Sequence, residues 1–213
     1  MTAPNPILLR RSVRDFTERE IPQELLHTIL SEAGRAPSWV NAQEWRAYVI
    51  TQETLKGYRQ AYAVRAASGD QGAPDYPVTH RETWSQRAQQ NMVQTGALME
   101  QSGVMDELQR SQTLLFNAPA LVFLTQPKTA NKYAIFDLGA FAQTLMLSAA
   151  SHGVDSVVAY NITKYPDLVR KTVPVPEDYA VVVGIALGYR SAAAVNSFSA
   201  PRMALGDYAI FLS

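Results

Sequence analysis

Three arginines and one serine lie within five residues near the start of the chain, at Arg10, Arg11, Ser12 and Arg14. Guanidinium groups bind phosphate through paired N–H donors, and a turn of the backbone adds further N–H groups. The cluster therefore predicts a site for a phosphomonoester. A solvated basic surface would have the same composition, so this segment alone leaves both interpretations open.

A polar and aromatic turn follows at residues 36–46. The amides of Asn41 and Gln43 can recognise the hydrogen-bonding edge of a planar heterocycle, and the indole of Trp39 can cover the face of an aromatic ring. The alternative is a loop in which Asn41 caps a turn and the tryptophans fill the core. A similar choice holds for residues 155–161, where either a strand end points backbone N–H groups at a ligand or a strand simply continues into a loop.

Several other kinds of chemistry are excluded by what the sequence lacks. There is no cysteine, no G-x-G-x-x-G, no G-x-x-x-x-G-K-[ST] and no G-x-S-x-G, and the three histidines have no metal-ligand spacing. The 19 Lys and Arg residues balance the 19 Asp and Glu residues, so no nucleic-acid or membrane partner is expected. A tightly held organic cofactor is the best remaining source of reactivity.

These segments must be positioned by helices and strands, which the apolar pattern predicts. Amphipathic spacing predicts a helix over residues 22–35, and a nearly all-apolar run predicts a buried helix over 136–152, at the centre of the core. Runs rich in β-branched residues predict strands at 45–51, 120–125 and 180–187. The mixed order without strict βαβ alternation predicts an α+β fold with one sheet flanked by helices.

The domain organisation is predicted to be simple. At 213 residues, with 47% hydrophobic and 18% charged residues, the chain is expected to fold as one domain over residues 1–213. Residues 55–115 are mostly polar and are expected to form peripheral helices around a Gly- and Pro-rich loop at 68–80. The N-terminus lacks a signal-peptide pattern, and a cytoplasmic location is expected.

Taken together, the ordered segments resemble the nitroreductase family of flavoproteins over nearly the whole chain. The segments that carry the resemblance are Arg10-Arg11-Ser12-Val13-Arg14, Ala36-Pro37-Ser38 with Asn41, Gln43 and Trp45, Pro74-Asp75-Tyr76-Pro77, Asn117-Ala118-Pro119, Asp137-Leu138-Gly139-Ala140 with Gln143, Tyr165-Pro166-Asp167, Gly184-Ile185-Ala186-Leu187-Gly188-Tyr189, and Asn196, Phe198 and Arg202. The resemblance implies an α+β homodimer with a mainly antiparallel sheet, two FMN sites at the subunit interface, and a C-terminal tail that reaches over the partner.

The resemblance also implies which residues hold the cofactor. The residues matching the family's FMN phosphate site are Arg10, Arg11, Ser12, Arg14 and Arg202. The residues matching the loop that the partner subunit lays against the isoalloxazine are Pro37, Ser38, Trp39, Val40 and Asn41. The backbone expected at the flavin's reactive edge is that of Val158, Ala159, Tyr160 and Asn161. Many relatives carry small residues where this chain has Trp39 and Val40, and proline where it has Glu44.

The resemblance implies an FMN-dependent NAD(P)H oxidoreductase that works in two steps. NADPH or NADH would reduce FMN, and the reduced flavin would then pass electrons to a nitroaromatic, quinone or similar small acceptor. The flavin carries the chemistry, so no catalytic side chain is assigned. The alternatives are a flavin reductase or other flavin-dependent reductase on the same scaffold, and a non-catalytic flavin-binding protein.

Overall fold

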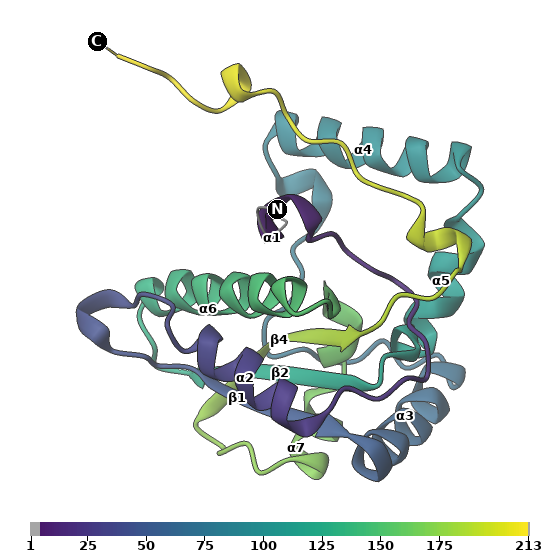
Figure 1. The fold of residues 1–213 in the computed structure, drawn as a ribbon, viewed down its shortest axis with the longest axis vertical. Helices are drawn as coiled ribbons and strands as arrows, with labels where there is room; N and C mark the ends of the chain where they lie inside the picture. The colour runs from purple at the N-terminus through teal and green to yellow at the C-terminus, as the bar shows by residue number, and fades with distance from the viewer. Residues whose placement is uncertain (1–4, 213) are drawn as a thin grey trace.

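The computed structural model describes residues 5–212, and one antiparallel sheet of four strands organises them (Figure 1). The strands are β1 (Arg46–Thr51), β2 (Ala120–Pro127), β3 (Asp155–Ala159) and β4 (Tyr179–Gly188), in the order β1-β2-β4-β3. Both neighbours of β4 pair with it antiparallel, and β1 pairs with β2 in the same way. The predicted α+β class and mainly antiparallel sheet are confirmed.

The two central strands are buried on both faces because helices cover both sides of the sheet. In β2, successive residues Val122, Phe123 and Leu124 are all fully buried although they point to alternate faces. The helices of the structure are α1 (Pro6–Leu9), α2 (Gln23–Ala33), α3 (Gln52–Ala67), α4 (Gln86–Gln101), α5 (Met105–Thr113), α6 (Lys132–Ser151) and α7 (Pro166–Thr172). Short 3-10 turns are η1 (Trp39–Asn41), η2 (Arg81–Thr83), η3 (Leu115–Asn117), η4 (Tyr160–Thr163), η5 (Ala194–Asn196) and η6 (Leu205–Asp207).

One face of the sheet carries α2 and α6. Their buried residues pack together with Val122 and Leu124 of β2 and with Ile185 and Leu187 of β4. Helix α6 begins four residues earlier than the predicted start at 136, because the Asn131 side chain accepts hydrogen bonds from Tyr133 N at 2.8 Å and Ala134 N at 3.2 Å. This helix is long and apolar enough to cross a membrane, and half of its apolar window is buried inside the fold. It is less covered than the sequence led us to expect, because Tyr133, Ile135 and Phe136 in its first turns are exposed.

The other face of the sheet carries α3 and α7, and here one prediction was wrong. The polar stretch from residue 55 was expected to be peripheral, yet α3 places Leu55, Tyr58 and Tyr62 in the core. The Tyr58 hydroxyl donates to Ile162 O at 2.8 Å, and its ring meets Phe123 of β2 edge-on at 5.2 Å. Only one narrow stripe of α3 is buried, and its large members are tyrosines, so a count of apolar residues underestimated it.

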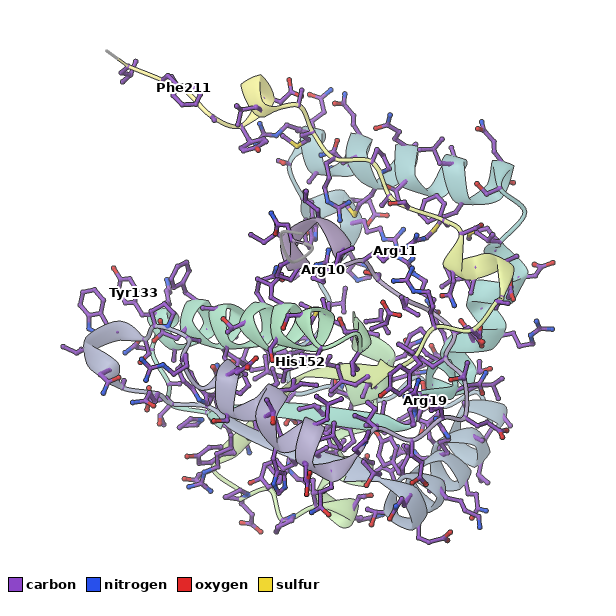
Figure 2. All side chains as sticks on the ribbon, viewed as in Figure 1. Arg10, Arg11, Arg19, Tyr133, His152 and Phe211 are labelled. Atoms are coloured by element: carbon purple, nitrogen blue, oxygen red, sulfur yellow. The ribbon has the colours of Figure 1, made fainter. Side chains whose placement is uncertain are left out.

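Helices α4 and α5 lie beside the body, where the C-terminal segment runs along α4 (Figure 1). A small separate cluster joins them to that segment through Met99, Val104, Val195 and Phe198. The last described residues then leave the body altogether, with Ile210, Phe211 and Leu212 all more than four-fifths exposed (Figure 2). No other described residue of the same chain covers this apolar end.

Gly184, in the middle of β4, should tolerate no side chain. A Cβ at this position would overlap the side chain of Ile162 in η4, the turn that follows β3. We expect Gly184→Ala to lower the free energy of unfolding by about 1–3 kcal/mol in denaturant titrations. The control is Gly57→Ala in α3, where a Cβ meets no atom within 4 Å and should raise stability by about 1 kcal/mol. Equal effects of the two substitutions would contradict the packing described here.

Candidate functional site

The basic segment near the N-terminus lies along the free edge of β3. Ser12 forms a parallel bridge with Ser156, and Val13 N donates to Ser156 O at 3.0 Å. Beyond this bridge, a cavity of about 200 Å³ opens at the end of the strand. Its lining residues are Ser12, Arg14, Gln112, Phe116, Val157, Val158, Ala159, Tyr160 and Asn161. The structure therefore brings two of the three segments singled out in the sequence into one site.

Arg14 is the cation of this cavity. Burial, and next the charge of Arg11, lower the pKa of its guanidinium. The side chain makes one hydrogen bond, to Ser12 O at 3.3 Å, and no carboxylate among residues 5–212 forms an ion pair with it. A partly buried guanidinium without a carboxylate is costly unless an anion neutralises it. The chemistry of the cavity thus fits a phosphate group.

Arg11 has a different task. Its Nη2 donates to the carbonyl oxygens of Asn196 and Phe198, the latter at 2.8 Å. The Asn196 side chain binds the same segment, because its Oδ1 accepts a hydrogen bond from Arg14 N at 2.8 Å and its Nδ2 donates to Asp15 O at 2.7 Å. We call these hydrogen bonds of Arg11 and Asn196 the clasp. The clasp fixes the arginine segment to the C-terminal chain. Sequence reasoning assigned Arg11 to phosphate and did not show this structural role.

Arg10 and Arg202, which were also assigned to the phosphate, do not line the cavity at β3. Arg10 is half-buried between α1 and Arg11, and no hydrogen bond joins its side chain to another described residue. Arg202 is exposed and lines another cavity, together with Arg87 of α4, rather than the one that holds Ser12 and Arg14. Within one chain, Arg202 is therefore not part of the cavity at β3.

The loop at residues 37–41 forms a second, apolar hollow of about 550 Å³. Its lining residues are Pro37, Ser38, Trp39, Lys132, Tyr133, Phe136 and Asp137. Trp39 stacks on Tyr133 with ring centroids 4.6 Å apart and is 55% exposed, so it does not fill the core. Trp45, in contrast, packs against Phe141 of α6 and does serve the core.

The two hollows lie apart in one chain. Tyr133 sits in the first turn of α6, whereas Ser156, which bridges to Ser12, follows shortly after its last turn. A 20-residue helix is about 30 Å long. Figure 2 shows Tyr133 at one end of α6, well removed from Arg10 and Arg11. Within one chain, the β3 cavity and the hollow beside Trp39 are therefore two separate sites.

Comparison with known proteins identifies the family. The family model described as the nitroreductase family matches residues 7–189. The chain belongs to the nitroreductase family. Nitroreductase NfnB of Mycolicibacterium smegmatis is 29% identical to it over 93% of this chain and 87% of the relative, and a chloronitrobenzene nitroreductase of Comamonas testosteroni is 28% identical over 95% and 93%.

Solved structures agree with this assignment. The FMN-dependent nitroreductase NfnB from Mycobacterium smegmatis, in complex with NADPH, matches this nitroreductase with a TM-score of 0.90 and 28% identity, over 98% of this chain and 97% of the other. The family resemblance inferred from the sequence is thereby confirmed.

Three residues that line the hollow beside Trp39 were not singled out as site residues in the sequence. Asp137 is buried, and its Oδ2 accepts a hydrogen bond from Trp39 N at 2.9 Å, which holds η1 against α6. Tyr133 and Phe136 supply the aromatic wall beside Trp39. The available signal was an acidic residue inside an otherwise apolar helix, because a carboxylate is rarely buried unless it is hydrogen-bonded.

We expect Asp137→Ala to loosen this loop. The backbone N–H of Trp39 would lose a charged acceptor, so the free energy of unfolding should fall by about 1.5–3 kcal/mol. The fluorescence of Trp39 should also shift, because the indole is released from its stacking on Tyr133. Asp178→Ala, at an exposed position, is the control. An unchanged fluorescence spectrum in a destabilised Asp137→Ala protein would show that Asp137 does not position Trp39.

Proposed function

We propose that this chain is an FMN-dependent NAD(P)H oxidoreductase that reduces nitroaromatics, quinones or similar acceptors by a two-step mechanism. The observation that carries the proposal is the partly buried Arg14 guanidinium, which lines a cavity beside Ser12 at the end of β3 and has no carboxylate partner among residues 5–212. Relatives named as FMN-dependent and as acting on nitroaromatic compounds support the same function.

The chain's own groups suit FMN at this site. Arg14, Ser12 and Arg10 would bind the phosphate, and the clasp through Arg11 and Asn196 would keep these donors in place. Past the Ser12 bridge, no described strand pairs with the outer edge of β3, so the backbone of residues 158–161 can face the flavin ring. When bound, FMN supplies the redox chemistry, exchanging a hydride with the nicotinamide and electrons with the acceptor. The protein binds, orients and excludes water.

We propose that the enzyme is a homodimer in which the loop at 37–41 of one subunit completes the flavin site of the other. The support is that the loop and the β3 cavity lie at opposite ends of α6 in one chain. An apolar surface is also left uncovered, with Ile7 and Leu8 of α1 and Phe136 of α6 between 65% and 82% exposed. Helix α1 contacts α6, so a second copy could cover both together.

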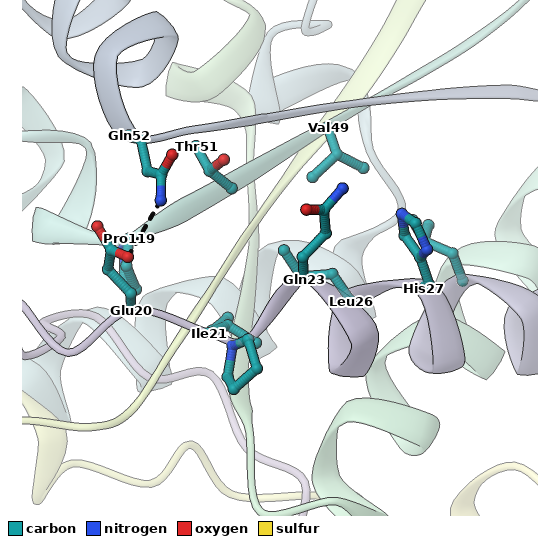
Figure 3. A pocket seen from close by; sticks show the side chains of 11 residues that line it. Glu20, Ile21, Gln23, Leu26, His27, Val49, Thr51, Gln52 and Pro119 are labelled. Carbon is teal, nitrogen blue, oxygen red and sulfur yellow. Dashed lines mark hydrogen bonds between the residues drawn. The ribbon is translucent and has the colours of Figure 1, made fainter.

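The C-terminal tail is proposed to cross to the partner. A groove of about 630 Å³ lies between α2 and the free edge of β1, and Ile21, Leu26 and Val49 are among its apolar lining residues (Figure 3). Glu20, Gln23 and His27 are among its polar lining residues. An extended apolar segment such as residues 208–212 can pair with a strand edge of this kind. We therefore expect the partner's tail in this groove.

The dimer makes a direct prediction. Light scattering should report about twice the 23.5 kDa of one chain, and deletion of residues 208–213 should lower the thermal midpoint while leaving each subunit folded. Because the site is shared, a variant that becomes monomeric should also release its flavin. A stable monomer that retains FMN would contradict the shared site.

The activity is tested by multiple turnover. The purified protein should oxidise NADPH steadily when 4-nitrobenzoate is supplied, and the rate should depend on bound FMN. Oxidation that occurs only with free flavin as acceptor would favour a flavin reductase, and flavin binding without any NADPH or NADH oxidation would favour a non-catalytic flavin-binding protein.

We propose that the enzyme works in the cytoplasm, in keeping with its lack of cysteine.

A further inference from the structure

The turn η3, just before β2, has an unusual backbone conformation. Leu115, Phe116 and Asn117 have φ angles of 51°, 62° and 57°, so three successive residues other than glycine are left-handed. Such residues are energetically costly and persist only where surrounding contacts fix them. Leu115 and Phe116 are both buried, and Phe116 lines the cavity at the end of β3. The strained turn therefore supplies part of the wall of that cavity.

Backbone strain of this kind gathers near the two hollows of the proposed flavin site. Seven residues other than glycine have a positive φ among residues 5–212. Three of them form the turn η3, and three more, Val40, Asn41 and Gln43, lie in the loop that carries Trp39. Strained residues cluster where proteins bind ligands or react. The contacts that fix η3 are thus candidates for residues that shape the cavity.

The carboxylate of Asp15 fixes this turn to the arginine segment. Asn117 Nδ2 donates to Asp15 Oδ2 at 2.8 Å, and Ser191 Oγ donates to Asp15 Oδ1 at 2.5 Å. The next residue along the chain adds a backbone hydrogen bond, from Phe16 N to Phe116 O at 3.0 Å. Asp15 forms no ion pair with any residue in the described range. Its half-buried carboxylate therefore serves to accept hydrogen bonds from neutral groups.

The backbone of Asp15 is held from a second direction. Asp15 directly follows Arg14, and it belongs to the clasp, because its N donates to Asn196 Oδ1 at 3.2 Å and its O accepts from Asn196 Nδ2 at 2.7 Å. One residue is thus bound to the C-terminal chain through its backbone and to η3 through its side chain. The turn cannot move relative to Arg14 unless the hydrogen bonds of Asp15 break.

We propose that Asp15 is a positioning residue of the flavin site, which holds Phe116 at the cavity wall in a fixed relation to Arg14. The inference rests on the proposed function, because it takes the ligand of this cavity to be FMN. Phe116 and Val157 are buried apolar residues of the lining, and an apolar wall that excludes water strengthens the attraction between Arg14 and an anion. Asp15 itself does not line the cavity, so it acts through the turn.

Two variants separate the hydrogen bonds of Asp15 from its charge. Asp15→Ala should raise the Kd for FMN about 10-fold, the size expected for one charged hydrogen bond. The shoulder of the visible flavin band should also weaken, because that shoulder is resolved best when the ring is shielded from water. Asp15→Asn keeps a side chain that can hydrogen-bond to both Asn117 and Ser191 without the charge, so it should restore most of the affinity and the shoulder.

The matched control is another carboxylate that accepts hydrogen bonds away from the cavity. Asp75 Oδ2 accepts from Arg170 Nη2 at 2.6 Å and from Val181 N at 2.7 Å, and Asp75 is not part of the lining. Asp75→Ala should lower the thermal midpoint, as Asp15→Ala should, but it should leave the FMN affinity and the flavin band unchanged. A loss of stability alone is thereby distinguished from a loss of positioning.

A further variant keeps the test informative if Asp15→Ala does not fold. Asn117→Gly removes the amide that binds Asp15, and glycine adopts a positive φ without strain, so the protein should remain folded. It should raise the Kd for FMN about 10-fold as well. Because both substitutions break the same contact, Asp15→Ala added to Asn117→Gly should weaken FMN binding by much less than the product of the two single effects.

Several results would overturn this role of Asp15 while leaving the proposed function intact. They are an unchanged FMN affinity and flavin band in folded Asn117→Gly, equal effects of Asp15→Asn and Asp15→Ala, and fully multiplicative effects in the double variant. A wild-type protein that binds no FMN would refute the proposed function and this role together. That result is seen before any variant is compared, so the two failures are distinguishable.

Discussion

Replacement of Arg14 by alanine is expected to weaken FMN binding by about 1.5–3 kcal/mol, which corresponds to about a 10- to 150-fold higher Kd. Arg14 is the cation that lines the cavity at the end of β3, and no carboxylate of the described chain neutralises it. Without a bound anion its burial is unfavourable, so Arg14→Ala should leave the flavin-free protein equally or more stable. Fluorescence titration with FMN and denaturation of the flavin-free protein measure the two effects.

Other arginines make this prediction specific. Arg10→Ala should weaken FMN binding in the same range, whereas Arg35→Ala, at an exposed position after α2, should leave it unchanged. Arg11→Ala should act through the fold, because the carbonyls of Asn196 and Phe198 would lose their donor. Its thermal midpoint should therefore fall before flavin is added. Normal FMN affinity in both Arg10→Ala and Arg14→Ala would refute the phosphate site.

Replacement of Trp39 by alanine is expected to change which acceptors the enzyme prefers. The indole is 55% exposed and lies flat against Tyr133 at 4.6 Å, so its outer face is presented to the hollow that we propose to close over the partner's flavin. Stacking of this kind contributes about 0.5–1.5 kcal/mol to binding a flat aromatic acceptor, while the bulk of the indole excludes larger ones. Trp39→Ala should lower kcat/KM for small nitroaromatics and raise it for bulkier quinones.

The two half-reactions separate this effect from a general loss of function. In stopped-flow measurements, reduction of the flavin by NADPH should change less than its reoxidation by the acceptor. Val40→Ala, at the adjacent and even more exposed position, is the comparison for a change in the loop alone. An unchanged order of acceptors in a well-folded Trp39→Ala protein would remove Trp39 from the acceptor site.

Much of the fold could be predicted because its central strands are buried on both faces and its longest helix packs on them with a largely apolar surface. The runs that became β2, β4 and α6 are almost continuously apolar, so their type and approximate limits are visible in the sequence. Helix α3 was misjudged as peripheral because its buried stripe consists mainly of tyrosines, whose hydroxyls find partners such as Ile162 O only in the folded chain. Hydrogen bonds of that kind leave no periodic signal.

The site was harder to predict because it depends on contacts between distant residues. Ser12 and Arg14 meet residues 157–161 only through the edge pairing with β3, and the family resemblance, rather than the spacing, assigned these residues to one site. The hydrogen bond of Asp137 to Trp39 N joins residues 98 positions apart, and Arg202 lies beside Arg87 of a helix that no motif singled out. Such partners are set by tertiary packing, which short motifs do not encode.

The central claim is that this nitroreductase carries FMN and cycles it between NADPH and an acceptor. The most direct measurement is the visible absorbance spectrum of the purified protein under anaerobic conditions. We expect a yellow protein whose flavin band bleaches when NADPH is added and returns when a nitroaromatic such as 4-nitrobenzoate follows, with FMN released on denaturation at one molecule per chain. A colourless protein that acquires no flavin band when FMN is supplied, or a flavin band that NADPH and NADH both leave unchanged, would contradict the account.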